Sequence, residues 1–403
     1  KISARIAQDG HTELFYPVKR PMLPPPDFNL ARVVETQDVL LSYPYQSIRP
    51  FIRMLNEAAQ DPDVLSIKMT LYRVAHESKI IEALISAAEN GKEVVAIVEL
   101  RARFDEQNNI DFSKQLEEAG CTVIYGFEAY KIHSKLTLIT KKKGNQLHYI
   151  AQIGTGNYNE KTSRLYTDLS LITSNSEIGL EAFEVFQALS LGETVEQTDV
   201  LFVAPNCLQN KVLDRIDREI KLTKEGKKGY LGFKLNSLTD KRIIDKLIEA
   251  SQAGVQIDMV VRGICCLQPG IPGYTDHIRI ISIVGRYLEH SRIFIFGTGE
   301  QQRIFMGSGD LLNRNTRRRV EVFAEVRDGD PRREILHLVD AIRMDNQNSW
   351  EMLSDGSYVK DNSDHAEPLD SHTYLHHYFE KPFELPPAKL SLKERLFGRF
   401  HKN

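Results

Sequence analysis

The sequence predicts an α/β protein built from two tandem copies of one domain, each a mixed β-sheet flanked by helices. Two observations support this fold class: strand and helix patterns alternate through the first half, and the same order returns in the second. A length of 403 residues, with 41% hydrophobic and 27% charged residues, suits two globular domains with sizeable cores.

In the first half, two strands flank an amphipathic helix. Residues 66–72 (SIKMTLY) and 94–100 (VVAIVEL) have the β-branched runs of buried strands, and residues 79–90 (KIIEALISAAEN) have helical periodicity and end at Gly91. A helix over 113–119 and strands over 122–125, 136–139 and 149–153 follow. This alternation is typical of a sheet covered by helices.

The second half repeats these features in order. A strand over 234–238, a helix over 241–252, Gly254 and a strand over 255–261 match the first series. IHSKLTLI (132–139) is mirrored by EHSRIFIF (289–296), and each is followed by a glycine turn, GTGN (154–157) or GSGD (307–310). We therefore expect duplicated domains over 32–200 and 201–352, after a proline-rich linker or strap over 1–31. A polar tail is predicted over 353–403, loosely packed over 361–387.

Charge and cysteine content narrow the partners and the compartment. A net charge of −3 and a pI near 6.5 give no indication of nucleic-acid binding. The four cysteines lack CxxC spacing, which favours reduced thiols in the cytoplasm. Residues 390–401 (LSLKERLFGRFH) predict a short basic helix that packs on the parent protein, with peripheral membrane contact as the alternative.

The duplicated His-Ser-Lys/Arg motifs are the strongest chemical signal. On a strand, His133 and Lys135 would share one face, and His290 and Arg292 would repeat that geometry. A neutral imidazole is a good nucleophile toward phosphorus, and an adjacent cation stabilises charge on the phosphoryl oxygens. Asn157 and the backbone amides of its glycine turn are candidates for holding another phosphate oxygen.

The paired motifs resemble the phospholipase D superfamily, in which two half-sites meet and one histidine is the nucleophile. The phosphodiesterases of that superfamily carry an aspartate five residues after the lysine to orient the imidazole. Thr140 and Gly297 occupy those places in this chain, which weakens a hydrolase interpretation.

Further motifs resemble the polyphosphate kinase family from about residue 35 to residue 360. They are DVLLSYPY (38–45), IKMTLYR (67–73), VELRARFDE (98–106), YKIHSK (130–135), IGTGNYN (153–159), LYTD (165–168), VRGI (261–264) and NRNTRRRVEV (313–322). The resemblance implies reversible transfer of the terminal phosphate of ATP to inorganic polyphosphate through a phosphohistidine, with Mg²⁺ as cofactor and ATP or ADP as substrates.

The resemblance also implies roles for individual residues. His133 is the phosphorylated nucleophile, and His290 acts in acid/base transfer at the nucleotide. Tyr166 and Arg262 match ATP-binding positions, and Arg73 and Arg103 match magnesium positions. Because a guanidinium has no lone pair for a metal, we expect these two arginines to grip phosphate oxygens instead. A basic channel for polyphosphate is expected to be lined by Arg314, Arg317, Arg318 and Arg319.

Family members carry two further domains before this region, an N-terminal domain that contacts nucleotide and a helical head domain used in dimerisation. The chain begins at Lys1 without an initiator methionine, so we expect a fragment that is weakly active or inactive alone and homo-oligomeric at full length. Two alternatives stay open. They are a phospholipase D-type phosphodiesterase and a polyphosphate-binding fragment without turnover.

Overall fold

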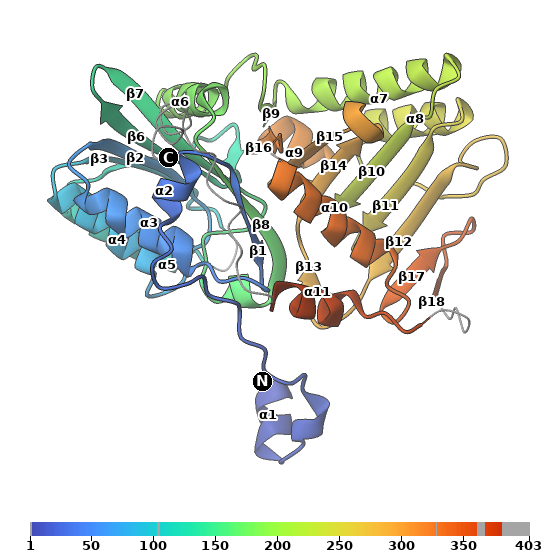
Figure 1. Cartoon of the computed structure of the whole chain (residues 1–403), viewed down its shortest axis with the longest axis horizontal. Helices are drawn as coiled ribbons and strands as arrows, with labels where there is room; N and C mark the ends of the chain where they lie inside the picture. Colours follow the sequence, from blue (N-terminus) through green and yellow to red (C-terminus); the bar gives the residue numbers. More distant parts are fainter. Residues whose placement is uncertain (1, 103–104, 328, 361–366, 381–403) are drawn as a thin grey trace, which may run out of the picture.

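Two β-sheets stand face to face in the computed structural model of the chain, which describes residues 2–102, 105–327, 329–360 and 367–380. The helices lie in three layers, outside the first sheet, between the sheets and outside the second sheet (Figure 1). The predicted pair of helix-flanked mixed sheets is thus confirmed.

The first sheet has the strand order β1-β8-β7-β6-β2-β3-β4, with β2, β3 and β4 parallel. Its strands are β1 (Val39–Tyr43), β2 (Val64–Leu71), β3 (Glu93–Val98), β4 (Thr122–Tyr125), β6 (Leu136–Lys143), β7 (Gln146–Gly154) and β8 (Tyr166–Thr173). β3 shows why a continuous apolar run suits this position. Val95 and Ile97 pack into the core between the sheets, whereas Val94, Ala96 and Val98 pack into the outer core with the helices.

The second sheet has the order β18-β17-β12-β11-β10-β14-β15-β16-β5, and β9 pairs with β16. Its own strands are β9 (Phe202–Ala204), β10 (Tyr230–Leu235), β11 (Gln256–Val261), β12 (Ile278–Ile283), β14 (Arg292–Phe296), β15 (Arg303–Gly307), β16 (Arg319–Glu325), β17 (Ser349–Met352) and β18 (Tyr358–Lys360). The predicted strand at 234–238 begins four residues earlier and ends at Leu235.

The helices divide among the three layers. On the outside of the first sheet are α2 (Leu30–Val34), α3 (Arg49–Gln60), α4 (Lys79–Glu89) and α5 (Glu106–Glu118). Between the sheets are α6 (Ser176–Ser190), α10 (Gly329–Arg343) and α11 (Ser371–Phe379). On the outside of the second sheet are α7 (Leu208–Lys224) and α8 (Lys241–Gln252). α1 (Ile2–Gln8) stands apart from the sheets, and α9 (Asn313–Arg318) precedes β16 (Figure 1).

The duplicated helices α4 and α8 form for the same local reasons. The side chains of Ser78 and Asp240 accept hydrogen bonds from first-turn amides, which satisfies donors that a helix start leaves free. Gly91 and Gly254 follow the other ends with φ of 78° and 90°, a backbone region that glycine adopts readily.

Two very short strands cross between the sheets. β5 (Lys131–Ile132) pairs with β16 of the second sheet, and β13 (Leu288–Glu289) pairs with β8 of the first. The chain returns to its own sheet at β6 and at β14. His133 therefore lies in a crossing segment and not on a strand, so the expectation that His133 and Lys135 share a strand face is wrong.

The tail is also more ordered than its composition predicted. α11 buries His372, Leu375, His376 and Phe379, so the expected loose packing is wrong for this segment. The predicted basic helix at 390–401 lies outside the described residues. No helix in the described part of the chain is long and apolar enough to cross a membrane.

Candidate active site

His133 is held by a carboxylate from the other half of the molecule. Its Nδ1 lies 2.9 Å from Oε1 and 3.0 Å from Oε2 of Glu321 in β16. Because a carboxylate only accepts, Nδ1 carries the proton and the lone pair is on Nε2. The His133 side chain is 12% exposed.

His290 has the equivalent arrangement, with the histidine in the second half and the carboxylate in the first. Its Nδ1 lies 2.9 Å from each carboxylate oxygen of Asp168, which belongs to β8 of the first sheet. The His290 side chain is 14% exposed. Each histidine is thus oriented by a carboxylate that the opposite half supplies.

Hydroxyl groups fix both carboxylates at matching places. Thr155 Oγ1 donates to Asp168 at 2.6 Å, and Ser308 Oγ donates to Glu321, in both cases across 13 residues of sequence. Asn315 Nδ2 adds a 2.6 Å hydrogen bond to Glu321. The sequence analysis missed Asp168 and Glu321 as orienting groups, although aligning the two glycine turns with the segments that follow would have paired them.

These carboxylates remove one argument against a phosphodiesterase. The aspartate missing at Thr140 and Gly297 does not leave either imidazole unoriented, because Glu321 and Asp168 perform that task. Thr140 is paired with Tyr149 inside the first sheet, and Gly297 follows the last residue of β14.

Burial sets the protonation of both half-sites. It lowers the pKa of His133 to about 3, with Glu321 opposing the shift, so the imidazole is neutral near pH 7. Burial also lowers the pKa of His290, again opposed by its carboxylate, Asp168. Although burial alone would raise the pKa of Glu321, the hydrogen bond from His133 and the charges of Lys135 and Arg319 lower it to about 2. Both rings therefore have a lone pair on Nε2 at neutral pH.

The cations beside the two histidines are held differently. Lys135 is buried, and its Nζ donates to the backbone oxygen of His133. Burial lowers the pKa of Lys135 to about 7, with Glu321 opposing and Arg292 and Arg319 adding to the shift. Arg292 instead donates to Asp310 at 3.3 Å, to Thr155 O at 3.1 Å and to His290 O at 2.7 Å.

Aromatic rings pack against both imidazoles. Tyr72 meets His133 edge-on with ring centroids 4.8 Å apart, and Tyr166 lies 5.2 Å from His290. The ring of Tyr72 is also near Lys135 Nζ, at 5.2 Å, and Arg73 Cζ, at 5.4 Å. Tyr72 is a third residue of the site that the sequence did not identify.

The expected ATP-binding residues come together at the second half-site. Arg262 donates to Asn236 at 3.2 Å, and Asn236 in turn donates to the backbone oxygen of His290. Burial and the nearby Arg292 lower the pKa of Arg262, and Tyr166 and Asp310 lie close enough to oppose that shift. Tyr166, Arg262, His290 and Arg292 therefore form one cluster.

The first glycine turn has a packing role besides any ligand role. A Cβ added at Gly156 would lie 2.1 Å from Asp168 Oδ2, so glycine is needed there for the carboxylate to fit. Asn157 follows, and its Oδ1 is buried without a hydrogen-bond partner among the described residues. Because phosphate oxygens accept hydrogen bonds, a phosphate contact at Asn157 would use the Nδ2 donor and not Oδ1.

The donors around Arg73 do not suit a metal ion held by side chains alone. A guanidinium has no lone pair, and Asp105 already forms an ion pair with Arg73 at 2.6 Å. Within the described residues, no three His, Cys, Asp or Glu side chains are grouped to hold an ion. Arg103, expected at the same place, lies outside the described residues.

The arginine-rich segment leads toward His133. Arg314, Arg317 and Arg318 are exposed on α9, with spacing that places them on one helix face. Arg319 begins β16 opposite Lys131, and its charge contributes to the lowered pKa of His133. Neither Glu321 nor Glu325 forms an ion pair with these four arginines among the described residues. Glu321 bonds to His133, and Glu325 bonds to Arg303 and Arg327.

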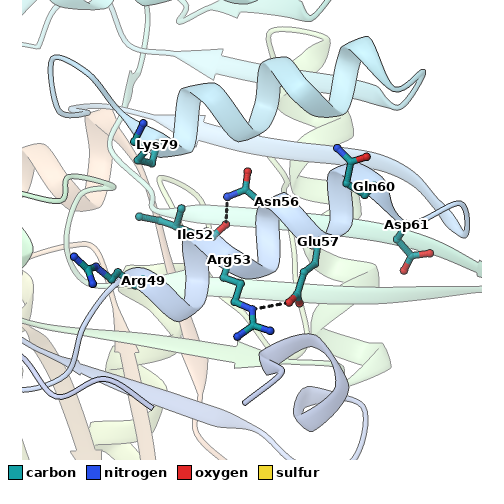
Figure 2. A pocket seen from close by; sticks show the side chains of 8 residues that line it. All are labelled: Arg49, Ile52, Arg53, Asn56, Glu57, Gln60, Asp61 and Lys79. Atoms are coloured by element: carbon teal, nitrogen blue, oxygen red, sulfur yellow. Dashed lines mark hydrogen bonds and ion pairs between the residues drawn. The ribbon is translucent and has the colours of Figure 1, made fainter. Parts of the chain in front are cut away.

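A separate hollow of about 620 Å³ lies on the outer face of α3 (Figure 2). Arg53 forms an ion pair with Glu57 there at 2.8 Å, and Lys79 reaches the hollow from the start of α4. None of its lining residues belongs to the two half-sites, so the hollow is a useful place for control substitutions.

The fold is that of two tandem phospholipase D-like domains. A phosphatidylserine synthase structure from Haemophilus influenzae has this fold, with a TM-score of 0.50 and 12% identity over 87% of this chain and 96% of that one. Models of polyphosphate kinase C-terminal domains 1 and 2 match residues 29–195 and 201–372. The chain belongs to the polyphosphate kinase family.

Individual relatives agree with this assignment. The polyphosphate kinase of Staphylococcus epidermidis is 44% identical over 86% of this chain and 47% of its own length. A crystal structure of polyphosphate kinase from Porphyromonas gingivalis has a TM-score of 0.83 and 35% identity, covering 91% of this chain and 56% of that one. The chain spans about half the length of the curated relatives it matches.

Proposed function

We propose that this chain is the phosphoryl-transferring half of a polyphosphate kinase, which moves the terminal phosphate of ATP reversibly to inorganic polyphosphate through a phosphohistidine. The observation that carries the proposal is the crossed pair of histidine–carboxylate contacts, with Lys135 buried beside His133. Membership of the polyphosphate kinase family supports the choice of substrates.

The first transfer uses the free nitrogen of His133. The lone pair on Nε2 attacks the terminal phosphorus of ATP, the bond from phosphorus to the bridging oxygen breaks, and ADP leaves. Glu321 holds the ring and stabilises the positive charge that forms on it. Lys135 stabilises the equatorial oxygens.

The second transfer regenerates the histidine. A terminal oxygen of polyphosphate attacks the phosphorus, the P–N bond breaks, and the electron pair returns to Nε2. The P–N bond has a transfer potential comparable to that of a phosphoanhydride, so both steps can run in either direction. In this proposal His290, held by Asp168 beside Tyr166 and Arg262, moves protons at the nucleotide.

The arginines of α9 and Arg319 would bind the polyphosphate chain, and Arg73 with Asn157 would contact phosphate oxygens. Magnesium would arrive coordinated to the phosphates of the nucleotide and would belong to the substrate. Four free thiols, one of them exposed, support a cytoplasmic site of action. Because the relatives are about twice as long, we further propose that preceding domains complete the nucleotide pocket and support homo-oligomer formation.

The test offers the chain two phosphoryl donors, ATP with magnesium and polyphosphate. We expect an acid-labile, base-stable phosphate on the protein, seen as a phosphohistidine signal in ³¹P NMR, and its discharge to ADP. Labelling should be slow with ATP and faster with polyphosphate, whose candidate contacts all lie in this chain. Release of an alcohol from a phosphodiester without labelling would favour the hydrolase, and binding without either reaction would favour the binding fragment.

A further inference from the structure

A buried polar network lies directly behind His290 and includes α11, the helix in the segment for which the sequence predicted loose packing. Glu289 is 3% exposed and receives three donors. Lys234 Nζ lies 2.7 Å from its Oε2, Thr167 Oγ1 donates to the same oxygen at 2.8 Å, and His372 Nε2 lies 2.6 Å from its Oε1. His372 belongs to α11 and is fully buried.

The partners of His372 settle its tautomer. The backbone N–H of Tyr287 donates to Nδ1 at 3.4 Å, so Nδ1 is the acceptor and Nε2 carries the proton that Glu289 accepts. His372 thus bonds to residues on both sides of Leu288 and clamps the two-residue strand β13. The contact is close, since a Cβ added at Gly285 would lie 2.8 Å from His372 Nδ1.

The network continues to the backbone of His290. Thr167 Oγ1, which donates to Glu289, accepts the His290 N–H at 3.2 Å. Lys234 Nζ also donates to Ser291 Oγ at 2.7 Å. The backbone N–H of His290 and the side chain of Ser291 are therefore held by Thr167 and Lys234, both of which bond to Glu289. Nδ1 of the His290 ring is held by Asp168.

α11 also contacts the first half of the molecule. The ring of Phe379 stacks on Tyr45 at 5.5 Å with planes 7° apart, and His376 meets Tyr45 edge-on at 5.1 Å. Leu375 is buried in the core between the sheets. Figure 1 shows α11 beside β13, where the two halves meet.

We propose that His372 is a positioning residue for the second half-site, acting through Glu289 and Thr167 to hold His290 against Asp168 and Tyr166. α11 then supports phosphoryl transfer by positioning His290, in addition to its packing in the core between the sheets. The role in transfer rests on the proposed function, whereas the positioning of His290 can be tested without any reaction.

Three variants of the full chain separate positioning from stability. His372→Phe keeps a ring of similar size and removes both hydrogen bonds. His372→Gln restores a donor toward Glu289. Leu375→Ala loosens the same helix without touching Glu289, and it should lower Tm by more than His372→Phe does, because it leaves a cavity in the core.

The first measurement follows the imidazole signals of ¹⁵N-histidine-labelled protein, with His290 and His133 assigned by substitution. We expect His372→Phe to shift the His290 Nδ1–H signal and leave that of His133 in place, His372→Gln to return it most of the way, and Leu375→Ala not to move it. An unmoved His290 signal in His372→Phe would overturn the proposal, as would an equal shift in Leu375→Ala.

The second measurement is transfer from polyphosphate to ADP at saturating substrate. His372→Phe should lower kcat by about 10- to 100-fold, the range of a lost hydrogen bond to a charged group, with little change in KM. His372→Gln should recover most of that rate. A shifted His290 signal in a chain that polyphosphate does not phosphorylate on histidine would leave the positioning intact and contradict the proposed function instead.

Discussion

Lys135 and Arg292 occupy equivalent places beside the two histidines, yet their surroundings differ. Among the described residues Lys135 donates a single hydrogen bond, to the backbone of its own motif, and its pKa is lowered to about 7. Arg292 is fixed by Asp310, Thr155 and His290. An ammonium with two donors left can follow a phosphoryl group as it moves, whereas a guanidinium held on several sides keeps one geometry. The difference supports the proposed division of roles, with phosphoryl transfer at His133 and acid/base chemistry at His290.

The largest effect that would separate the half-sites is loss of the nucleophile. His133→Ala should abolish the acid-labile protein phosphate and lower turnover by at least about 10⁴-fold, since covalent catalysis cannot proceed without its nucleophile. Labelling with ³²P from polyphosphate measures this. His148→Ala, which removes an exposed histidine of β7, is the matched control and should label normally. Equal labelling of His133→Ala would end the assignment.

Loss of the second histidine should have a smaller and different effect. His290→Ala is expected to slow transfer by about 10²- to 10⁴-fold, the usual range for general acid/base help, and to leave slow labelling at His133. Single-turnover labelling beside steady-state turnover would show the split. Phosphate found on His290, with none on His133, would reverse the two roles.

Each carboxylate orients the histidine of the opposite half. Substituting a carboxylate should therefore impair the reaction of the histidine in the other half. Glu321→Gln should impair label formation on His133 by about 10- to 100-fold, through loss of a charge-assisted hydrogen bond. Asp168→Asn should instead impair the nucleotide-dependent step by a similar factor. If Glu321→Gln altered only the behaviour of His290, the contacts across the two halves would not have the roles we assign.

The lowered pKa of Lys135 gives a pH dependence with a defined sign. Its ammonium is charged below about pH 7 and loses its proton above, so anion binding that needs this charge should weaken as the pH rises. Affinity for tripolyphosphate should then fall by up to about tenfold per pH unit above 7. Lys135→Arg keeps its charge and should show a flatter profile by calorimetry. Parallel profiles for the two proteins would contradict the prediction.

The smallest effect is expected on the surface of α9. Replacing Arg317 and Arg318 by Gln should weaken polyphosphate binding and reduce the slope of log affinity against log salt by about one unit for each phosphate that is no longer bound. The double substitution Arg49→Gln and Arg53→Gln in the hollow of Figure 2 removes the same charge elsewhere and should leave the slope unchanged. An unchanged slope in the α9 variant would place the polyphosphate channel on another surface.

The sequence predicted the features that depend only on neighbouring residues. The helices α4 and α8, their capping residues and their closing glycines follow from short stretches of sequence. The carboxylate partners do not, because His133 and Glu321 are 188 residues apart and a periodic pattern does not reveal which distant segment approaches it. Two-residue strands such as β5 and β13 are too short for periodicity to detect.

α11 was missed for a different reason. Its sequence SHTYLHHYF has the composition of a polar tail, but His372 and His376 are buried because Glu289 and Tyr287 satisfy their ring nitrogens. A buried polar side chain is stable only when it is hydrogen-bonded, and the partners of these two histidines lie in another part of the chain.

The exchange of carboxylates between the halves also bears on the ancestry of the chain. Two identical subunits related by a twofold axis would each give a histidine to one site and a carboxylate to the other, so that neither could act alone. Joining two such subunits into one polypeptide preserves both contacts and frees the copies from being identical. A lysine could then stand at one site and an arginine at the other, so that the two sites could take different roles within a single chain.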